Sequence, residues 1–255
     1  MAFDAAVSLR IVNNERLRRS ESWGEYRDLR GALVFTSDAP TADSNRVESF
    51  TADDSTIEDL LDIGFALLRA FDCEPAACVT PLDHPVPLEE RLGRRGLHLA
   101  ERSVAMVHRG HTRQLDAGGV AVRRAAPDDA QLVAGIVTAG GPKWAKVMVL
   151  KGVLAGILEP GHSFYIGELA GEPVGTVQLL VDGATAGIYG VATLKAHRQR
   201  GVCTALMATA IADARAAGCD VIGLRTEMEG PVRKLYASLG FEEAHTSSLW
   251  VQHAR

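Results

Sequence analysis

The chain has 255 residues with 47% hydrophobic and 23% charged side chains, which suits one large globular domain or two small ones. A formal net charge of −5 at pH 7 argues against a general nucleic-acid binder and against electrostatic attachment to anionic lipid, because both need a basic face. With no signal-like N-terminus, no apolar run long enough to cross a bilayer and no cysteines at metal-ligand spacing, the sequence predicts a cytoplasmic protein that holds no metal.

The first part of the chain predicts a mixture of helices and strands. Its clearest signal is Thr56 to Phe71, which repeats apolar residues at helical spacing after Ser55, a favourable N-cap residue. A polar, glycine-rich stretch from Arg109 to Gly119 follows this part, and we place a domain boundary there, between residues 115 and 116. The expected elements are a helix at 5–19, a strand at 32–35, a helix at 56–71, a strand at 76–80, a helix at 88–94 and a strand at 103–108.

The second part predicts the order β-α-α-β-β-β-α-β-α-β, an α/β pattern with a mixed sheet. Ala170-Gly171-Glu172 and Asp182-Gly183 separate consecutive strands and are typical of hairpin turns. The expected strands are 120–124, 164–169, 174–181, 185–194, 221–225 and 247–251, and the expected helices are 127–137, 143–158, 202–217 and 232–239.

The stretch from Thr56 onward repeats the helix–strand–helix–strand order of the chain's end. Arg91 to Leu97 is similar to Leu235 to Phe241 at a constant offset, and Met106-Val107 then falls on Trp250-Val251. We interpret this similarity as a diverged internal duplication. A chance resemblance between two short helix–Gly–strand units is the alternative.

A basic loop lies between the strand that ends near Leu194 and the helix that begins at Val202. A helix N-terminus directs unsatisfied backbone N–H groups and a positive partial charge at one point, and this arrangement favours a pyrophosphate. Arg198 and Arg200 add charge, and Gly201 lets the backbone approach the ligand closely. Taken alone, such a loop is also compatible with solvated surface.

A second motif, Leu235-Tyr236 through Gly240-Phe241, follows one strand later. With Arg198-Gln199-Arg200-Gly201-Val202-Cys203 it resembles the GNAT N-acetyltransferase family, in which a Q/R-x-x-G-x-G/A loop precedes a helix that reads L-Y-x-x-x-G-F. The resemblance extends from Val120 to Val251. It implies an acyl-CoA N-acyltransferase fold in that part of the chain.

The resemblance implies a role for each motif. Backbone amides of the loop would bind the CoA pyrophosphate, and the preceding strand end would pair with the pantetheine arm as an added strand would. The amide of Val191 would polarise the thioester carbonyl, and Tyr236 would protonate the departing CoA thiolate. The implied cofactor-binding residues are Val191, Ala192, Thr193, Arg198, Gln199, Arg200, Gly201, Val202, Cys203 and Thr204.

Two departures and one missing role stay open. Cys203 stands where the family usually has Gly or Ala, either as a packed small residue or as a thiol whose pKa the helix N-terminus lowers. Glu229 replaces a frequent asparagine. No motif defines the general base; Glu227 is the first candidate, with an exposed loop carboxylate as its alternative reading, and Tyr189 and His162 are weaker candidates.

The first part lacks this equipment. Asp53 and Asp54 precede its clearest helix, where acidic groups would repel a pyrophosphate, and Leu92 occupies the place of the tyrosine. We therefore expect residues 1–115 to form a degenerate GNAT-like domain that binds no CoA, and residues 116–255 to form the catalytic domain. Few strand signals precede Thr56, so the first part should not form a complete domain alone.

By resemblance to tandem GNAT enzymes, the chain is expected to transfer an acetyl group from acetyl-CoA to the amine of a small molecule by direct attack. The acceptor could be an amino acid, a polyamine, an amino sugar or an antibiotic-like amine. A protein or peptide N-acetyltransferase and a non-catalytic acyl-CoA-binding regulatory module are the alternatives. No nucleic-acid or membrane partner is expected, and a homodimer stays open.

Overall fold

The computed structural model describes residues 3–110 and 119–252, so most of the predicted linker at 109–119 lies outside the described residues. The strands are β1 (Gly24–Asp28), β2 (Leu33–Ser37), β3 (Arg46–Glu48), β4 (Ala76–Val79), β5 (His98–His108), β6 (Ala121–Arg124), β7 (His162–Leu169), β8 (Glu172–Asp182), β9 (Thr185–Thr193), β10 (Val221–Glu227) and β11 (Phe241–Val251). The helices are α1 (Ala5–Ser22), α2 (Ile57–Ala70), α3 (Leu88–Arg94), α4 (Ala130–Val137), α5 (Lys143–Leu158), α6 (Val202–Ala216) and α7 (Pro231–Ser238).

Every helix and strand expected from the sequence is present, and the predicted mixed α/β class is confirmed. Two strands, β1 and β3, were not expected, so the first part has more strands before Thr56 than its sequence indicates. β1 is a polar edge strand, and β3 is only three residues long and buries Arg46 and Glu48 as an ion pair. Neither has the run of apolar residues that marks a strand. Among the described residues, the structure has no helix that could span a membrane.

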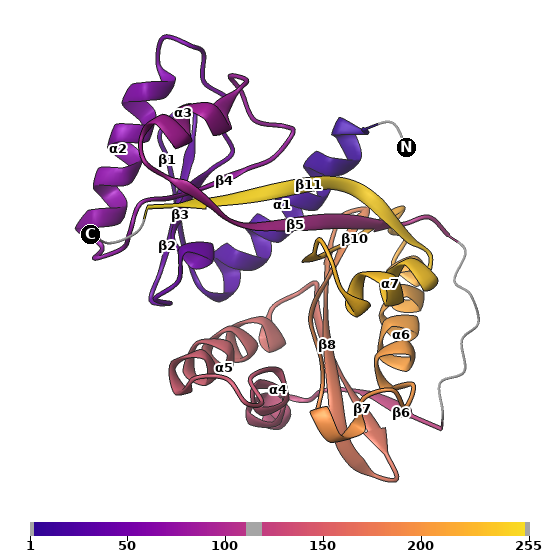
Figure 1. Ribbon diagram of the computed structural model, residues 1–255. Coiled ribbons are helices and arrows are strands. Elements are labelled where there is room, and N and C mark those ends of the chain that lie inside the picture. The colour runs from indigo at the N-terminus through magenta and orange to yellow at the C-terminus, as the bar shows by residue number, and fades with distance from the viewer. Residues whose placement is uncertain (1–2, 111–118, 253–255) are drawn as a thin grey trace.

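All described strands join one sheet in the order β1-β2-β3-β4-β11-β5-β10-β9-β8-β7-β6. The two halves exchange their last strands. β11, from the end of the chain, pairs with β4 of the first half, and β5, from the first half, pairs with β10 of the second. Figure 1 shows β5 and β11 running side by side between the two halves. Each half of the sheet is therefore completed by a strand from the other.

The pairing of β5 with β11 carries the internal repeat in its register. The sequence offset that aligns Gly96 with Gly240 also aligns His98 with Glu242 and Val107 with Val251. The strand pair contains both Glu242–Val107 and its equivalent under this offset, His98–Val251. The pairs Trp250–Leu99 and Glu243–Met106 are equivalent under the same offset, and both are also present. Ser103 pairs with Ser247, its own counterpart, so a pseudo-twofold axis passes through this point.

The irregularities of this pair repeat as well. One bulge leaves out Ala244 between Glu243 and His245, and the other leaves out Ala100 opposite the Leu249/Trp250 step. Ala100 and Ala244 are equivalent under the same shift. A β-bulge is a local feature that depends on its own sequence, so its appearance at equivalent alanines supports the interpretation of a diverged duplication over a chance resemblance.

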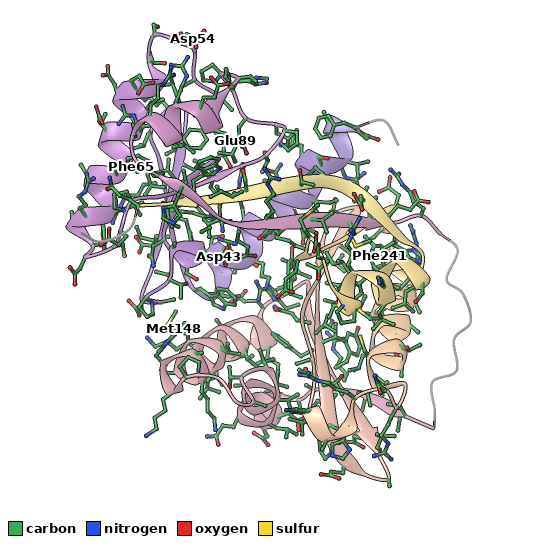
Figure 2. All side chains as sticks on the ribbon, in the orientation of Figure 1. Asp43, Asp54, Phe65, Glu89, Met148 and Phe241 are labelled. Atoms are coloured by element: carbon green, nitrogen blue, oxygen red, sulfur yellow. The ribbon has the colours of Figure 1, made fainter. Side chains whose placement is uncertain are left out.

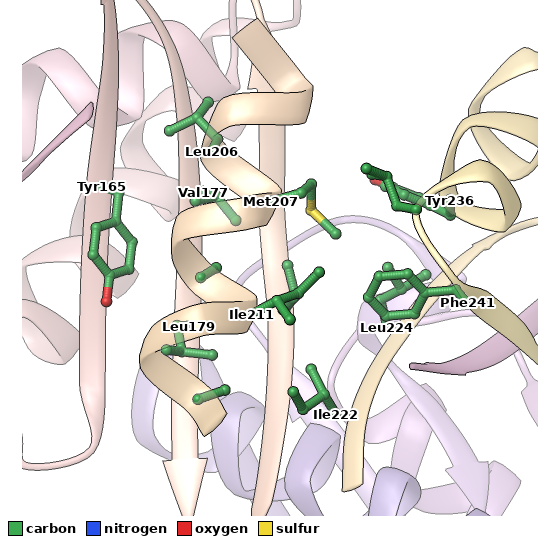
Figure 3. Packing of buried hydrophobic residues seen from close by; sticks show 14 of the residues in the cluster. Tyr165, Val177, Leu179, Leu206, Met207, Ile211, Ile222, Leu224, Tyr236 and Phe241 are labelled. Carbon is green, nitrogen blue, oxygen red and sulfur yellow. The ribbon is translucent and has the colours of Figure 1, made fainter. Parts of the chain in front are cut away.

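Each half has its own hydrophobic core, and each core takes residues from the exchanged strand. In Figure 2, Phe65 lies among the side chains of the first half and Phe241 among those of the second. Val104 and Met106 of β5 are buried in the core of the second half, and Trp250 of β11 packs against the core of the first. Figure 3 shows part of the second core, where α6 packs on the strands and core side chains lie between α6 and α7. Separating the halves would therefore open both cores.

Helices cover both faces of the sheet. α6 packs on β7, β8 and β9 on one face, and α4 and α5 pack on the other, with α1 crossing the middle of the molecule (Figure 1). A central ionic cluster, defined as Glu15, Arg19, Arg46, Glu48 and Arg225, fixes α1 to strands of both halves. The Glu15 carboxylate lies 2.7 Å from Arg225 of β10 and 3.0 Å from Arg19.

The charges of the cluster balance one another. Burial raises the pKa of Glu15, but the charges of Arg225, Arg19 and Arg46 outweigh burial and hold that pKa well below its ordinary value. Breaking a buried ion pair by removing one partner typically destabilises a protein by about 3–5 kcal/mol, because the other charge stays buried. The cluster therefore holds α1 in one position across both halves.

The exchange predicts that neither half folds as a monomer alone. A chain of residues 1–110 would leave the β4 edge unpaired and remove both sheet neighbours of β5, and exposed strand edges of this kind aggregate. We expect this fragment to form aggregates in light scattering, and to become soluble when it is co-expressed with residues 119–255. A monomeric fragment with a cooperative thermal transition would contradict the prediction.

His245 predicts an acid-sensitive stability. Its side chain is buried, neither ring nitrogen has a partner among the described residues, and burial and the nearby Arg225 lower its pKa to about 4. Between pH 6.5 and 4 the unfolded chain therefore binds a proton that the folded chain does not, so the free energy of unfolding falls as the pH falls through this window. The loss reaches about 3 kcal/mol at most.

His245→Gln isolates this contribution, because the other titrating groups are common to both proteins. Urea unfolding at pH 7, 5 and 4 should show the wild-type protein losing more stability than the variant below pH 6.5, with no such difference in slope above it. Parallel pH dependences for the two proteins would show that His245 is not held neutral.

Candidate active site

The second half of the sheet opens where β9 and β10 separate. These parallel strands pair only from Val221–Thr185 to Gly223–Gly187. Beyond Gly187, β9 continues to Thr193 with half-buried residues, and no described strand pairs with it on the β10 side. The predicted pantetheine-binding residues lie on this stretch. Its free edge can accept an added extended chain, as the sequence prediction requires.

A bulge interrupts β9 at the same place. Gln178 of β8 pairs with Tyr189 and Thr176 pairs with Ala192, so Gly190 and Val191 together oppose one residue of β8. Gly190 has a φ of +55°, a conformation that favours glycine. The bulge takes the Val191 amide out of the regular ladder, and this places the predicted oxyanion donor at the start of the opening between the strands.

The basic loop leads into α6 without a side-chain cap. Gly201 is the N-cap with a φ of +80°, and no side chain bonds to the first turn of the helix. The amides of Val202, Cys203 and Thr204 therefore have no helical acceptor, because the first turn of a helix leaves its N–H groups unpaired. These are the amides predicted to bind the pyrophosphate, and an anion is the ligand that such a helix end favours.

The first turn of α6 lies directly on the sheet because Gly175 has no side chain. A Cβ atom at Gly175 would lie 2.5 Å from Cγ1 of Val202 and 3.0 Å from the carbonyl oxygen of Ala192. The missing side chain brings the helix N-terminus down onto β8 and next to the end of β9. The two parts of the predicted cofactor site, the strand end and the helix end, are thus adjacent.

Basic side chains surround this helix end. The Arg198 guanidinium donates through Nε to the carbonyl of Thr193 at 3.3 Å, and Arg200 lies 3.3 Å from His197. Gln199 has a φ of +61°, which turns the chain between the two arginines. Most of the guanidinium donors stay exposed, so both arginines can reach a phosphate in front of α6.

Tyr236 lies on α7 and is 6% exposed, next to Phe241 with 6.1 Å between the ring centroids. Figure 3 shows its ring directed at the side of α6 that carries Met207. Burial and the neighbouring Cys203 thiol raise the pKa of Tyr236 above its ordinary value. The hydroxyl therefore stays protonated at neutral pH and can donate a proton close to the start of α6.

Cys203 is a packed residue. Burial raises the pKa of its thiol to about 11, so the thiol is protonated at neutral pH. The alternative of a reactive thiolate at the helix N-terminus is not supported, since desolvation outweighs the helix dipole here. Cys203 packs against the core of the second half, as a small apolar residue would.

The predicted base candidates lie in three different settings. Glu227 is exposed at the end of β10, opposite Ser103 of β5. Tyr189 is half-buried, donates a hydrogen bond to Asn14 at 2.7 Å, and has a raised pKa chiefly because of desolvation. His162 is enclosed between Glu21 and Gln178, at 2.8 and 2.9 Å. Of the three, Glu227 is the exposed one.

Glu101 is a candidate that the sequence does not reveal. It lies on β5, and burial, Asp43 and Glu227 together raise the pKa of its carboxyl group. A carboxylate with a raised pKa beside a second carboxylate is a typical acid–base arrangement. Glu101 comes from the first half and reaches Glu227 only through the strand exchange, which no local sequence pattern indicates.

The corresponding helix end in the first half is closed. The N-cap of α2 is Thr56 rather than the expected Ser55, and the Asp53 carboxylate accepts hydrogen bonds from the amides of both residues at 3.0 Å. A carboxylate of the chain thus occupies the position in which a phosphate would bind. Leu92, at the position of Tyr236, is fully buried in the core of the first half.

Comparison with known proteins agrees with this geometry. Residues 141–241 match the model of the acetyltransferase (GNAT) family. The matched range includes the β9 bulge, the α6 loop and the tyrosine helix. No curated protein matches the chain. Among the described residues, no three or more His, Cys, Asp or Glu side chains gather in a way that could hold a metal ion.

Solved structures extend the similarity over the whole chain. A GCN5-related N-acetyltransferase from Kribbella flavida matches with a TM-score of 0.74 at 18% identity, over 100% of this chain and 98% of that one. A GCN5-related N-acetyltransferase from Sphaerobacter thermophilus matches with a TM-score of 0.67 at 15% identity, over 93% and 84% of the two chains. A tandem GNAT protein from the clavulanic acid biosynthesis pathway matches with a TM-score of 0.63 at 13% identity, over 87% and 78%.

At these identities the solved structures establish the fold alone. The whole chain has the fold of GNAT acyltransferases, with a diverged GNAT-like first half, as the sequence predicts. The division at residue 115 remains a prediction, because the exchanged strands make the two halves structurally interdependent.

Gly201→Glu tests the helix end as the CoA site. The substitution strains a backbone with positive φ and places negative charge where phosphate would bind, so the dissociation constant for CoA should rise at least roughly tenfold. Isothermal calorimetry measures the change. Gly201→Asn is the matched control, because asparagine tolerates this φ and adds no charge. Undiminished CoA binding by the Glu variant would show that the site lies elsewhere.

Proposed function

We propose that the protein is an N-acetyltransferase that moves an acetyl group from acetyl-CoA to the amine of a small molecule by direct attack. The observation that carries the proposal is the uncapped N-terminus of α6 beside the free edge of β9. One surface there offers anion-binding amides and an unpaired strand edge. A phosphate-bearing, extended molecule with amide groups in its arm fits both, and CoA has this chemistry.

The residues present also fit acetyl-CoA by size and charge. Gly201 leaves the N-terminus of α6 without a side-chain cap, Gly175 lets that end pack next to the end of β9, and Arg198 and Arg200 supply positive charge around it. When it is bound, acetyl-CoA supplies the activated acetyl group. The roles of the chain are to bind the phosphates, to hold the thioester carbonyl against an N–H donor, and to move two protons.

Four residues would carry the last two of those roles. The Val191 amide donates to the carbonyl oxygen as negative charge develops there. Glu227, with Glu101 beside it, takes the proton that the attacking ammonium must lose. A nitrogen–carbon bond then forms as the carbon–sulfur bond breaks, and Tyr236 gives its proton to the departing sulfur. The raised pKa of Tyr236 keeps that proton available at neutral pH.

Tyr236→Phe tests the proposed general acid. Removing the hydroxyl should lower the rate of the chemical step roughly ten- to a thousandfold and leave the affinity for CoA almost unchanged, because the proton is needed only as the thiolate leaves. The substrate is an amine found by screening a panel for thiol release from acetyl-CoA. Single-turnover kinetics gives the rate, and calorimetry gives the affinity.

Tyr165→Phe is the matched control for this variant. Tyr165 is buried in the same core, and its hydroxyl donates to Asp213 away from the opening, so its loss affects packing and stability but not proton transfer. Equal rates for the wild-type protein and Tyr236→Phe would reduce Tyr236 to a packing residue. If CoA binds but no small amine or peptide is acetylated, the protein is a non-catalytic acyl-CoA-binding module. Acetylation of peptides alone would identify a protein acetyltransferase.

A further inference from the structure

A cavity of about 260 Å³ reaches the β9 bulge from the side of α4 and α5. It lies between the end of α1, these two helices and strand β8, and Gly190 forms part of its wall. Gly190 directly precedes Val191, the proposed donor to the thioester carbonyl. A molecule in this cavity would therefore lie next to the acetyl group if the proposed function holds.

The walls of the cavity are mainly apolar, and no acidic residue lines it. The apolar lining residues are Trp23, Val133, Val137, Val149, Val153 and Phe164. The polar lining side chains are those of Arg18, Ser22, Thr176 and Gln178. A polyamine or an amino sugar with several cationic groups would need carboxylates here, because buried charges in proteins are paired. The lining offers no partner for the additional cationic groups of such an acceptor.

Two hydroxyl groups of the lining have no protein partner. Oγ of Ser22 and Oγ1 of Thr176 are buried and make no hydrogen bond within residues 3–110 and 119–252. Thr176 is only 1% exposed. Buried polar atoms are almost always hydrogen-bonded in folded proteins, so these two hydroxyls are lining groups whose hydrogen-bonding capacity the described residues leave unused.

Arg18 differs from the other arginines of α1. Arg10 lies 2.5 Å from Asp220, Arg16 lies 3.7 Å from Glu48, and Arg19 lies 3.0 Å from Glu15. Arg18 makes no salt bridge in the described part of the chain. Its Nε donates to Gln178 at 3.1 Å, and its guanidinium packs on the rings of Trp23 and Tyr189 at 4.2 and 4.5 Å.

Gln178, Trp23 and Tyr189 therefore position the Arg18 guanidinium, and no carboxylate of the described residues forms a salt bridge with it. Burial lowers its pKa to about 10, which still leaves the guanidinium protonated at neutral pH. Arg18 is half-buried, and a planar guanidinium in such a place is stabilised by a carboxylate, which it binds with two parallel hydrogen bonds. The two aromatic rings and Gln178 orient the guanidinium at the wall of the cavity but cannot neutralise it.

From these contacts we infer that the cavity binds the acyl acceptor, and that this acceptor is an amino acid with an apolar side chain, whose carboxylate pairs with Arg18. The inference rests on the proposed function, because it names the acceptor of that same reaction. Arg18 is then the specificity-determining residue. The amine points to Gly190 and Val191, and the apolar walls from α4 and α5 surround the side chain.

A substrate panel of matched amines tests the inference on the wild-type protein. Leucine is compared with leucinamide and 3-methylbutylamine, phenylalanine with its amide and with phenethylamine, and spermidine represents polyamines. Thiol release from acetyl-CoA gives kcat/KM for each. The carboxylated member of each set should exceed the members without a carboxylate at least roughly tenfold, because only it neutralises Arg18.

Arg18→Met removes the charge and keeps most of the apolar stem. It should lower kcat/KM for the carboxylated amines roughly ten- to a hundredfold, mainly through KM, and leave CoA binding unchanged. Arg18→Lys should restore part of the loss. Arg10→Met is the matched control on the same helix, because it removes an arginine whose ion pair with Asp220 lies away from the cavity.

Binding is measured separately, so that the two proposals can fail independently. Fluorescence of Trp23 should change on titration with leucine in the presence of CoA, and a Trp23→Phe variant identifies that signal. Acetylation of amines regardless of their carboxylate, a preference for spermidine, or unchanged kinetics in Arg18→Met would overturn the inference and leave the proposed function intact. Leucine binding without acetyl transfer to any amine would retain the cavity assignment and overturn the proposed function. If leucine neither binds nor reacts, the inference is wrong.

Discussion

The antiparallel pair of β5 and β11 is the constraint on which the rest of the molecule depends. Each strand comes from one half and lies beside a strand of the other, so the sheet is continuous only when both halves are folded. The exchanged strands also supply core residues, such as Val104 in the second half and Trp250 in the first. Since backbone hydrogen bonds and apolar burial both cross this pair, the two halves form one cooperative unit although the sequence repeats within it.

The separation of β9 and β10 follows from the same arrangement. β10 has β5 as its antiparallel neighbour along its outer half, with pairs from Gly223 to Glu227, while its parallel pairing with β9 stops at Gly223. The backbone groups of β10 are thus satisfied on one side as the strand turns away from β9. This leaves the β9 edge open for a ligand. The first half contributes its strand β5 to this part of the sheet.

How much of this the sequence could predict depends on the range of each interaction. The α6 loop, the tyrosine helix and the strands around them are local patterns, and their positions were predicted within a few residues. β3 could not be predicted, because its three residues are stabilised by the ion pair of Arg46 and Glu48 and not by an apolar run. The strand exchange, Glu101 and the cavity at Arg18 depend on contacts between distant segments. Nothing in the sequence near Arg18 indicates that it lacks an acidic partner while its neighbours on α1 have one.

The two halves illustrate how a repeated fold can diverge at one helix end. In the sheet order, β3 and β9 lie at equivalent distances from the β5–β11 pair. Helix α2 follows β3 in the chain, and helix α6 follows β9. At α2 the Asp53 carboxylate accepts from the amides of Ser55 and the N-cap Thr56, whereas no side chain caps the first turn of α6 after Gly201. A carboxylate within the chain satisfies the helix end permanently and stabilises the fold, while an open end keeps its electrostatic attraction for a ligand. The first half is therefore free to evolve as a structural partner. The end of its helix α1 forms one wall of the cavity beside α4, α5 and β8, and Arg18 lies in that wall.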